Sequence, residues 1–106
     1  MATENGSNSD LGGYIQRTLG CQVFDDNSGS ANIVRHQITQ LSPDIGGRRL
    51  SEYVADFYGD QGYKVFSLVP GRSLEVKKDR ARYVVTMDLT QNGGVLDIRN
   101  LRVAAA

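Results

Sequence analysis

The histidine and the cysteine of this chain, one of each, are the two side chains with the widest use in catalysis. His36 could act as a general acid or base, but that role needs an orienting group and a nucleophile or second acid, and the sequence indicates neither. Cys21 follows the predicted C-terminal end of a helix, where the helix dipole does not favour a thiolate. We interpret His36 as a partly exposed structural residue and Cys21 as a buried, unreactive thiol.

Residues 25–30 read Asp-Asp-Asn-Ser-Gly-Ser, a composition typical of calcium loops. The spacing does not fit an EF-hand loop, which needs Gly at position 6 and Glu at position 12. One Cys and one His do not make a zinc site. Neither GxGxxG nor a P-loop motif is present, and Gly46-Gly47-Arg48-Arg49 is most simply a helix start with two solvated arginines. We therefore expect a polar turn at 25–30, no metal site and no cofactor.

The basic residues near the C-terminal end are the best candidates for binding. Lys77, Lys78, Arg80 and Arg82 fall within six residues at a predicted turn, and Arg72 and Arg99 complete a possible patch. Such a patch would bind an acidic protein surface. Weak nucleic-acid binding is a further alternative, but Tyr83 is the one aromatic residue in the stretch 72–99, and its position in the alternating pattern places it in the core. Protection of an edge strand against aggregation explains the same lysines without a partner.

The formal net charge is zero and the isoelectric point is about 6.5, which gives no general argument for nucleic acid or membrane. Residues 1–60 carry eight acids and four Lys or Arg, a balance of −4, whereas residues 61–106 carry the reverse, +4. A single cysteine excludes an intramolecular disulfide. Without a long apolar run or a signal peptide, we expect a soluble, cytoplasmic protein.

Turn signals divide residues 63–103 into four runs rich in β-formers. Pro70-Gly71, the charged cluster 77–80 and the stretch 91–94 separate them, which predicts an antiparallel meander. Ahead of it, an apolar stripe from Leu50 to Tyr58 predicts a helix at about 48–58. This stripe should bring Val54 and Phe57 against Tyr83, Val85 and Met87.

The N-terminal part is less regular. Residues 1–9 are small and polar and are expected to form a disordered tail. Asp10 is a candidate N-cap for a short helix that ends near Gly20, followed by a strand at 21–24. Residues 32–41 fit a helix and a strand equally well.

Two features of the meander predict self-association. The run 64–69 is apolar on both faces, which suits burial on both sides or a second contact. Leu101 and Val103 are out of phase with Leu96 and Ile98, so either a bulge near Asn100 restores the phase or these residues form an apolar face elsewhere. One helix layer covers one face of a sheet, so a homodimer is expected unless the N-terminal helix covers the other face.

The sequence thus predicts one α+β domain over residues 10–106, with the main helix packed on a curved antiparallel meander and a short N-terminal helix. This order of elements is compatible with cystatin-like and related small α+β folds. We expect a small non-catalytic binding or adaptor protein that acts through its sheet and basic hairpin. The alternative is a ligand pocket between helix and sheet, with or without enzymatic activity, lined by Tyr53, Tyr58, Tyr63 and His36.

Overall fold

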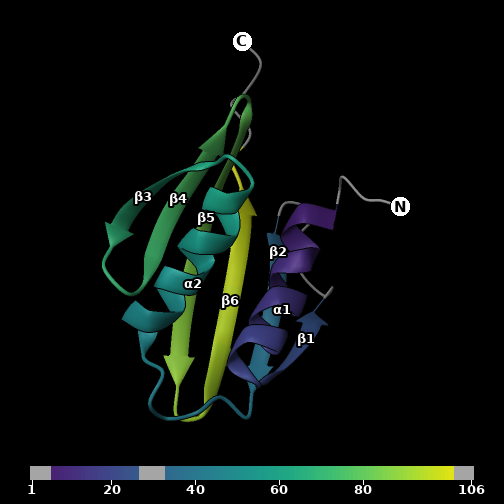
Figure 1. Cartoon of the computed structure of the whole chain (residues 1–106), viewed down its shortest axis with the longest axis vertical. Coiled ribbons are helices and arrows are strands. Elements are labelled where there is room, and N and C mark those ends of the chain that lie inside the picture. Colours follow the sequence, from purple (N-terminus) through teal and green to yellow (C-terminus); the bar gives the residue numbers. More distant parts are fainter. Residues whose placement is uncertain (1–5, 27–32, 102–106) are drawn as a thin grey trace.

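The computed structural model of the protein describes residues 6–26 and 33–101, with the side chains of 6–10 left aside. This part of the chain forms two helices and six strands (Figure 1). In chain order these are α1 (Gly6–Leu19), β1 (Gln22–Asp26), β2 (Ile33–Thr39), α2 (Gly47–Asp60), β3 (Lys64–Val69), β4 (Ser73–Lys78), β5 (Ala81–Thr90) and β6 (Gly93–Asn100). The predicted α+β class and the main helix are confirmed.

All six strands belong to one antiparallel sheet with the order β1-β2-β6-β5-β4-β3. The predicted meander forms one continuous part of it, from β3 to β6. The β1–β2 hairpin adds to this meander because β2 pairs with β6, so β1 and β3 become the opposite edges of the sheet (Figure 1).

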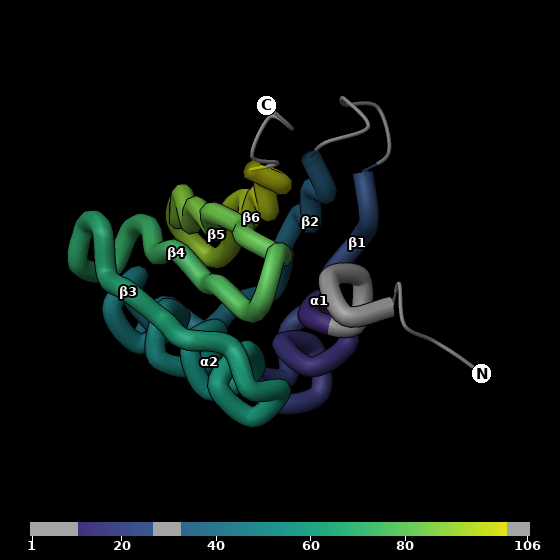
Figure 2. Tube along the Cα trace, turned by 90° about the horizontal axis from the view of Figure 1, so that it is seen from above, coloured from purple at the N-terminus to yellow at the C-terminus, as the bar shows by residue number. Residues whose placement is uncertain are grey.

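Both helices lie on the same face of the sheet, and the sheet curls around them (Figure 2). Helix α1 contacts β1 and β2, α2 contacts β3, β4 and β5, and the two helices contact each other. The alternative that the N-terminal helix covers the second face is therefore wrong. No described helix or strand covers that second face, which we call the open face.

The core fills the space between the helices and the sheet. Helix α1 contributes Leu11 and Ile15, one turn apart, and α2 contributes Leu50, Val54 and Tyr58 at the same spacing. The sheet contributes alternate residues of its inner strands, as expected from a strand period of two: Ile38, Leu74, Val76, Val85, Met87, Leu96 and Ile98. Val54 is fully buried as predicted, whereas Phe57 is only half-buried and packs against Tyr14 and Tyr58.

Several predicted boundaries differ from those in the structure. Residues 33–39 are a strand, because β2 finds hydrogen-bonding partners on both sides, in β1 and β6. Helix α1 begins at Gly6, so residues 6–9 are helical and Asp10 is not its N-cap; residues 1–5 of the expected tail lie outside the described residues. Asp25 and Asp26 belong to β1, and the rest of the expected turn, 27–30, lies outside the described residues.

Strand β3 is not buried on both faces, as one alternative held. It is an edge strand on which Phe66, Leu68 and Val69 are each 49% exposed. The Pro70-Gly71 turn that follows has Gly71 at φ 74°, with the Arg72 N–H donating to the Val69 carbonyl at 2.9 Å, as a type II turn requires. Strand β6 continues without a bulge to Asn100, so Leu101 comes to lie beside Ile33 and Val84 on the open face. Val103 lies outside the described residues.

Candidate functional site

The register of the sheet places three basic residues side by side on the open face. Lys64 on β3 is paired with Lys77 on β4, and Lys77 is paired with Arg82 on β5. Directly paired residues have Cβ atoms about 5 Å apart. Three positive charges from different strands therefore form one row across the sheet.

A depression of about 370 Å3 opens at the β3 end of this row. Its lining combines three lysines, Lys64, Lys77 and Lys78, with Gly62, Phe66 and Asp79. Arg80 follows at the β4–β5 turn and is exposed. We call Lys64, Lys77, Lys78 and Arg80 the basic corner, and Phe66 gives it an exposed aromatic ring.

Lys78 also has a structural role. Its Nζ donates a hydrogen bond to the carbonyl of Gln61, the residue that caps α2, at 2.7 Å. The same ammonium group lies 5.6 Å from the centre of the Tyr63 ring, within the range of a cation–π contact. A positive charge at this position also complements the negative end of the helix dipole. Lys78 is thus held in place at the corner.

The other predicted basic residues are not part of this corner. Arg82 ends the row but is ion-paired with Glu75 on the same face. Arg72 lies at the opposite end of β4, 3.8 Å from Asp88. Arg99 lies towards the middle of the open face, beside a second depression of about 390 Å3. The six predicted residues therefore do not form a single patch.

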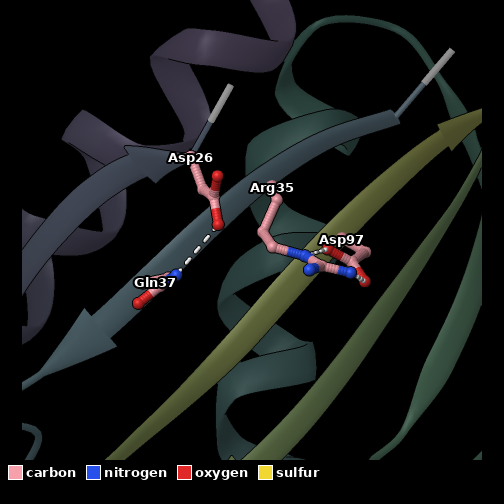
Figure 3. Close-up of polar contacts among 4 residues, drawn as sticks. All are labelled: Asp26, Arg35, Gln37 and Asp97. Atoms are coloured by element: carbon pink, nitrogen blue, oxygen red, sulfur yellow. Dashed lines mark hydrogen bonds and ion pairs between the residues drawn. The ribbon is translucent and has the colours of Figure 1, made fainter. Parts of the chain in front are cut away.

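The open face becomes less basic from β3 towards β1. Arg35 on β2 donates two hydrogen bonds to Asp97 on β6, at 2.8 and 3.2 Å, and Gln37 donates one to Asp26 at 3.0 Å (Figure 3). The Asp97 carboxylate raises the pKa of Arg35, through its hydrogen bond first and its charge second. The β1 edge, with Asp25 and Asp26, is acidic, and the β3 edge is basic.

His36 is buried, with 1% of its surface exposed, so the interpretation as a partly exposed residue is wrong. Its Nδ1 lies 2.7 Å from Oδ1 of Asp25, the residue opposite it on β1. Gly12 of α1 packs directly on the ring: a Cβ there would be 3.0 Å from Nδ1. The carboxylate orients the ring, as in many catalytic sites, but the glycine contact also makes His36 a packing residue between α1 and the sheet.

The tyrosines of the alternative pocket pack against one another or bind neighbouring side chains. The Tyr58 and Tyr63 rings pack edge to face with their centres 5.2 Å apart, and the Tyr63 ring in turn packs against the Tyr83 ring. Burial, and then the neighbouring tyrosines, raises the pKa of the Tyr58 phenol. Tyr53 is half-buried, and the hydrogen bond that Arg49 donates to its hydroxyl oxygen raises the pKa of that guanidinium group.

Cys21 is buried and free, as predicted. Burial raises the pKa of its thiol more than a backbone hydrogen bond lowers it. Among the described residues, no group of three or more His, Cys, Asp or Glu side chains is arranged to hold a metal ion. None of the helices in this part of the chain is long and apolar enough to cross a membrane.

The sequence reasoning missed Lys64 of the basic corner and Phe66 in the depression beside it. The signal was present: pairing residues outward from the Pro70-Gly71 turn places Lys64 opposite Lys77 and Phe66 opposite Glu75, as observed. Comparisons with protein-family models, curated proteins and solved structures found no match.

Proposed function

We propose that the protein is a non-catalytic binding protein that docks an acidic protein surface at its basic corner. The observation that carries this proposal is the cross-strand row of Lys64, Lys77 and Arg82, which opens into the depression beside Phe66. Carboxylates of a partner would meet the ammonium groups, and an apolar side chain of the partner would cover the exposed ring.

The row is unfavourable for the isolated protein. Like charges placed directly opposite each other on neighbouring strands are destabilising. Glu75 offsets the charge of Arg82, but it lies in the next row and leaves Lys64 facing Lys77. A partner carboxylate would relieve this repulsion, so binding and stability make opposite demands at this site.

Protection of the sheet edge accounts for only part of the corner. Charged residues on an edge strand hinder unwanted pairing, and Lys64 on β3 has that position. Lys77 and Lys78 lie on β4, which is paired on both sides and has no free edge to protect. The corner therefore carries more positive charge than edge protection requires.

The basic corner favours a protein partner over nucleic acid. Asp79 lies within the depression and Glu75 beside it, so negative charges alternate with the positive ones. A phosphate backbone would meet these carboxylates, whereas a protein surface with mixed charges can complement both signs. The formal net charge of zero gives no long-range attraction for a polyanion.

The test is a titration of the isotope-labelled protein with a peptide of alternating Glu and Phe residues, followed by amide chemical shifts. We expect shifts confined to the start of β3 and to β4, and weaker binding at higher salt. A peptide with Lys in place of Glu should produce none. The double variant Lys64→Glu/Lys77→Glu should lose the response.

A matched control separates local from overall charge. The variant Arg17→Glu/Arg48→Glu makes the same change in net charge on exposed helix positions and should bind the peptide as the native protein does. Equal weakening in both variants would contradict a docking site at the corner. A single-stranded oligonucleotide that shifts the same amides at lower concentration than the peptide would replace the proposed partner class.

A further inference from the structure

The two edges of the sheet complement each other in charge, and both expose apolar surface. Strand β1 carries Asp25 and Asp26 directly after Phe24, which is 56% exposed, and β3 carries Lys64 two residues before Phe66, which is 49% exposed. No described strand pairs with the outer edge of either one (Figure 1). Unpaired edges of this kind are templates for pairing with another chain.

The backbone groups that face outward follow from the hydrogen bonds. The Met87 N–H donates to the Arg72 carbonyl at 2.7 Å, on one side of the Ser73–Thr86 pair. In an antiparallel ladder, hydrogen-bonded pairs alternate with non-hydrogen-bonded pairs. Counted from this bond across β4, the backbone N–H and C=O groups of Lys64 and Phe66 point to β4, and those of Val65 and Ser67 point outward. On β1 the Val23 N–H points away from β2, since it donates to Gln16 Oε1 at 3.0 Å.

We propose that the acidic β1 edge of one copy pairs antiparallel with the basic β3 edge of the next, so that the sheet continues from chain to chain. This rests on the proposed function, because it names a second copy of the chain as the acidic partner. One register satisfies both edges: Phe66 opposite Phe24 of the neighbouring copy. In this register Val65 is paired with Asp25 of the neighbouring copy and Ser67 with its Val23, so that the outward backbone groups of the two edges face each other.

The same register brings complementary side chains together on the open face. Lys64 lies opposite Asp26 of the neighbouring copy, and both this pair and the Phe66–Phe24 pair fall at non-hydrogen-bonded positions. Side chains are closest at such positions, where aromatic and oppositely charged pairs stabilise most. The irregularity after Ser67 limits the pairing to a few residues, so the contact is short and association is weak.

Charge disfavours the symmetric alternatives. A two-fold pairing of two β3 edges would join two basic edges, and a two-fold pairing of two β1 edges would join two acidic ones, so neither gains the attraction between opposite charges. The head-to-tail contact instead leaves one free edge of each kind at the ends, so it adds further copies beyond a dimer unless the rotation between neighbours closes a ring. The Gln16 side chain, which is exposed, must leave the Val23 amide for each addition.

Sedimentation over a range of concentrations up to about 1 mM tests the proposal, since weak contacts have dissociation constants of that order. We expect a mass above the 11.6 kDa of one chain that grows with concentration without stopping at two copies and falls with added salt. Ser67→Pro removes an outward N–H, and none that bonds to β4, and should leave a monomer, whereas Ser67→Ala, the matched control, should assemble as the native chain does.

Mixing and charge exchange test the head-to-tail arrangement. Ser67→Pro keeps its β1 edge, so adding it to the native chain should shorten the assemblies. Lys64→Asp and Asp26→Lys should each weaken association by at least about tenfold, and the double exchange should restore it. Circular dichroism checks that each variant is folded; a single exchange that does not fold leaves the proline variant to decide. A native chain that stays monomeric, or a discrete dimer that Ser67→Pro does not disturb, would overturn the proposal.

The experiments distinguish a failure of the edge-pairing proposal from a failure of the proposed docking function. If the acidic peptide binds at the basic corner but the native chain stays monomeric, the corner binds a different protein. If the chain assembles through its edges and the peptide produces no shifts, Lys64 serves strand pairing alone and the docking function is wrong.

Discussion

Gly47, the first residue of α2, allows the helix to approach the β3–β4 turn. A Cβ at this position would lie 2.2 Å from the carbonyl oxygen of Gly71, about 1 Å closer than van der Waals contact allows. Both groups belong to the backbone, so a rotamer change cannot relieve the overlap, and either the first turn of α2 or the type II turn must move. Overpacking of this kind costs about 1–3 kcal/mol, and a backbone partner places it near the upper end.

Helix propensity acts in the opposite direction, because Ala is favoured over Gly inside a helix by about 1 kcal/mol. We therefore expect Gly47→Ala to lower the free energy of unfolding by about 2 kcal/mol and the melting temperature by roughly 10 °C. Gly59→Ala in the same helix is the matched control: its Cβ would meet nothing within 4 Å, so it should stabilise by about 0.5–1 kcal/mol. Urea unfolding measures both, and a Gly47→Ala protein as stable as the native one would refute the close approach.

Three further predictions follow from buried and paired groups. Burial raises the pKa of Tyr58 above the value near 10 of an unfolded chain, so the stability it contributes is complete below about pH 10 and declines at higher pH; urea unfolding across that range should show a smaller decline in Tyr58→Phe. Cys21, buried and with a raised pKa, should react with a thiol reagent only after denaturant is added, and fast reaction of the folded protein would contradict its placement. Lys77→Gln removes a like-charge pair with Lys64 and should raise the free energy of unfolding by about 0.2–1 kcal/mol while weakening peptide binding.

Local signals in the sequence were enough for the meander and the main helix. The turn at Pro70-Gly71 and the stripe of α2 depend on neighbouring residues, and the structure follows them. The strand at 33–39 could not be distinguished from a helix, because its conformation is decided by β6, about sixty residues later. The position of β6 between β2 and β5 is likewise a long-range effect, and it is what makes β1 an edge of the sheet.

The candidate site was predictable in part. Lys77, Lys78 and Arg80 were identified from their clustering, and Lys64 could have been found from the hairpin register. The Asp25–His36 contact could not be predicted, because residues 32–41 had no assigned conformation and hence no partner strand. The pairing of Arg82 with Glu75, which removes a charge from the patch, depends on which faces of β4 and β5 point the same way.

The pairing of β2 with β6 also determines the order in which this chain can fold during its synthesis. The paired residues are separated by 56 positions at Ile38–Gly94 and by 66 at Ile33–Arg99. At about 5–20 residues per second, a ribosome needs roughly 3–12 s to make the strand that β2 requires. During that interval the edge of β2 that later pairs with β6 is unpaired, and the β1–β2 hairpin lacks the strands that later extend its sheet. The N-terminal third of the chain is thus made first but cannot join the rest of the sheet until β6, its last strand, has been made.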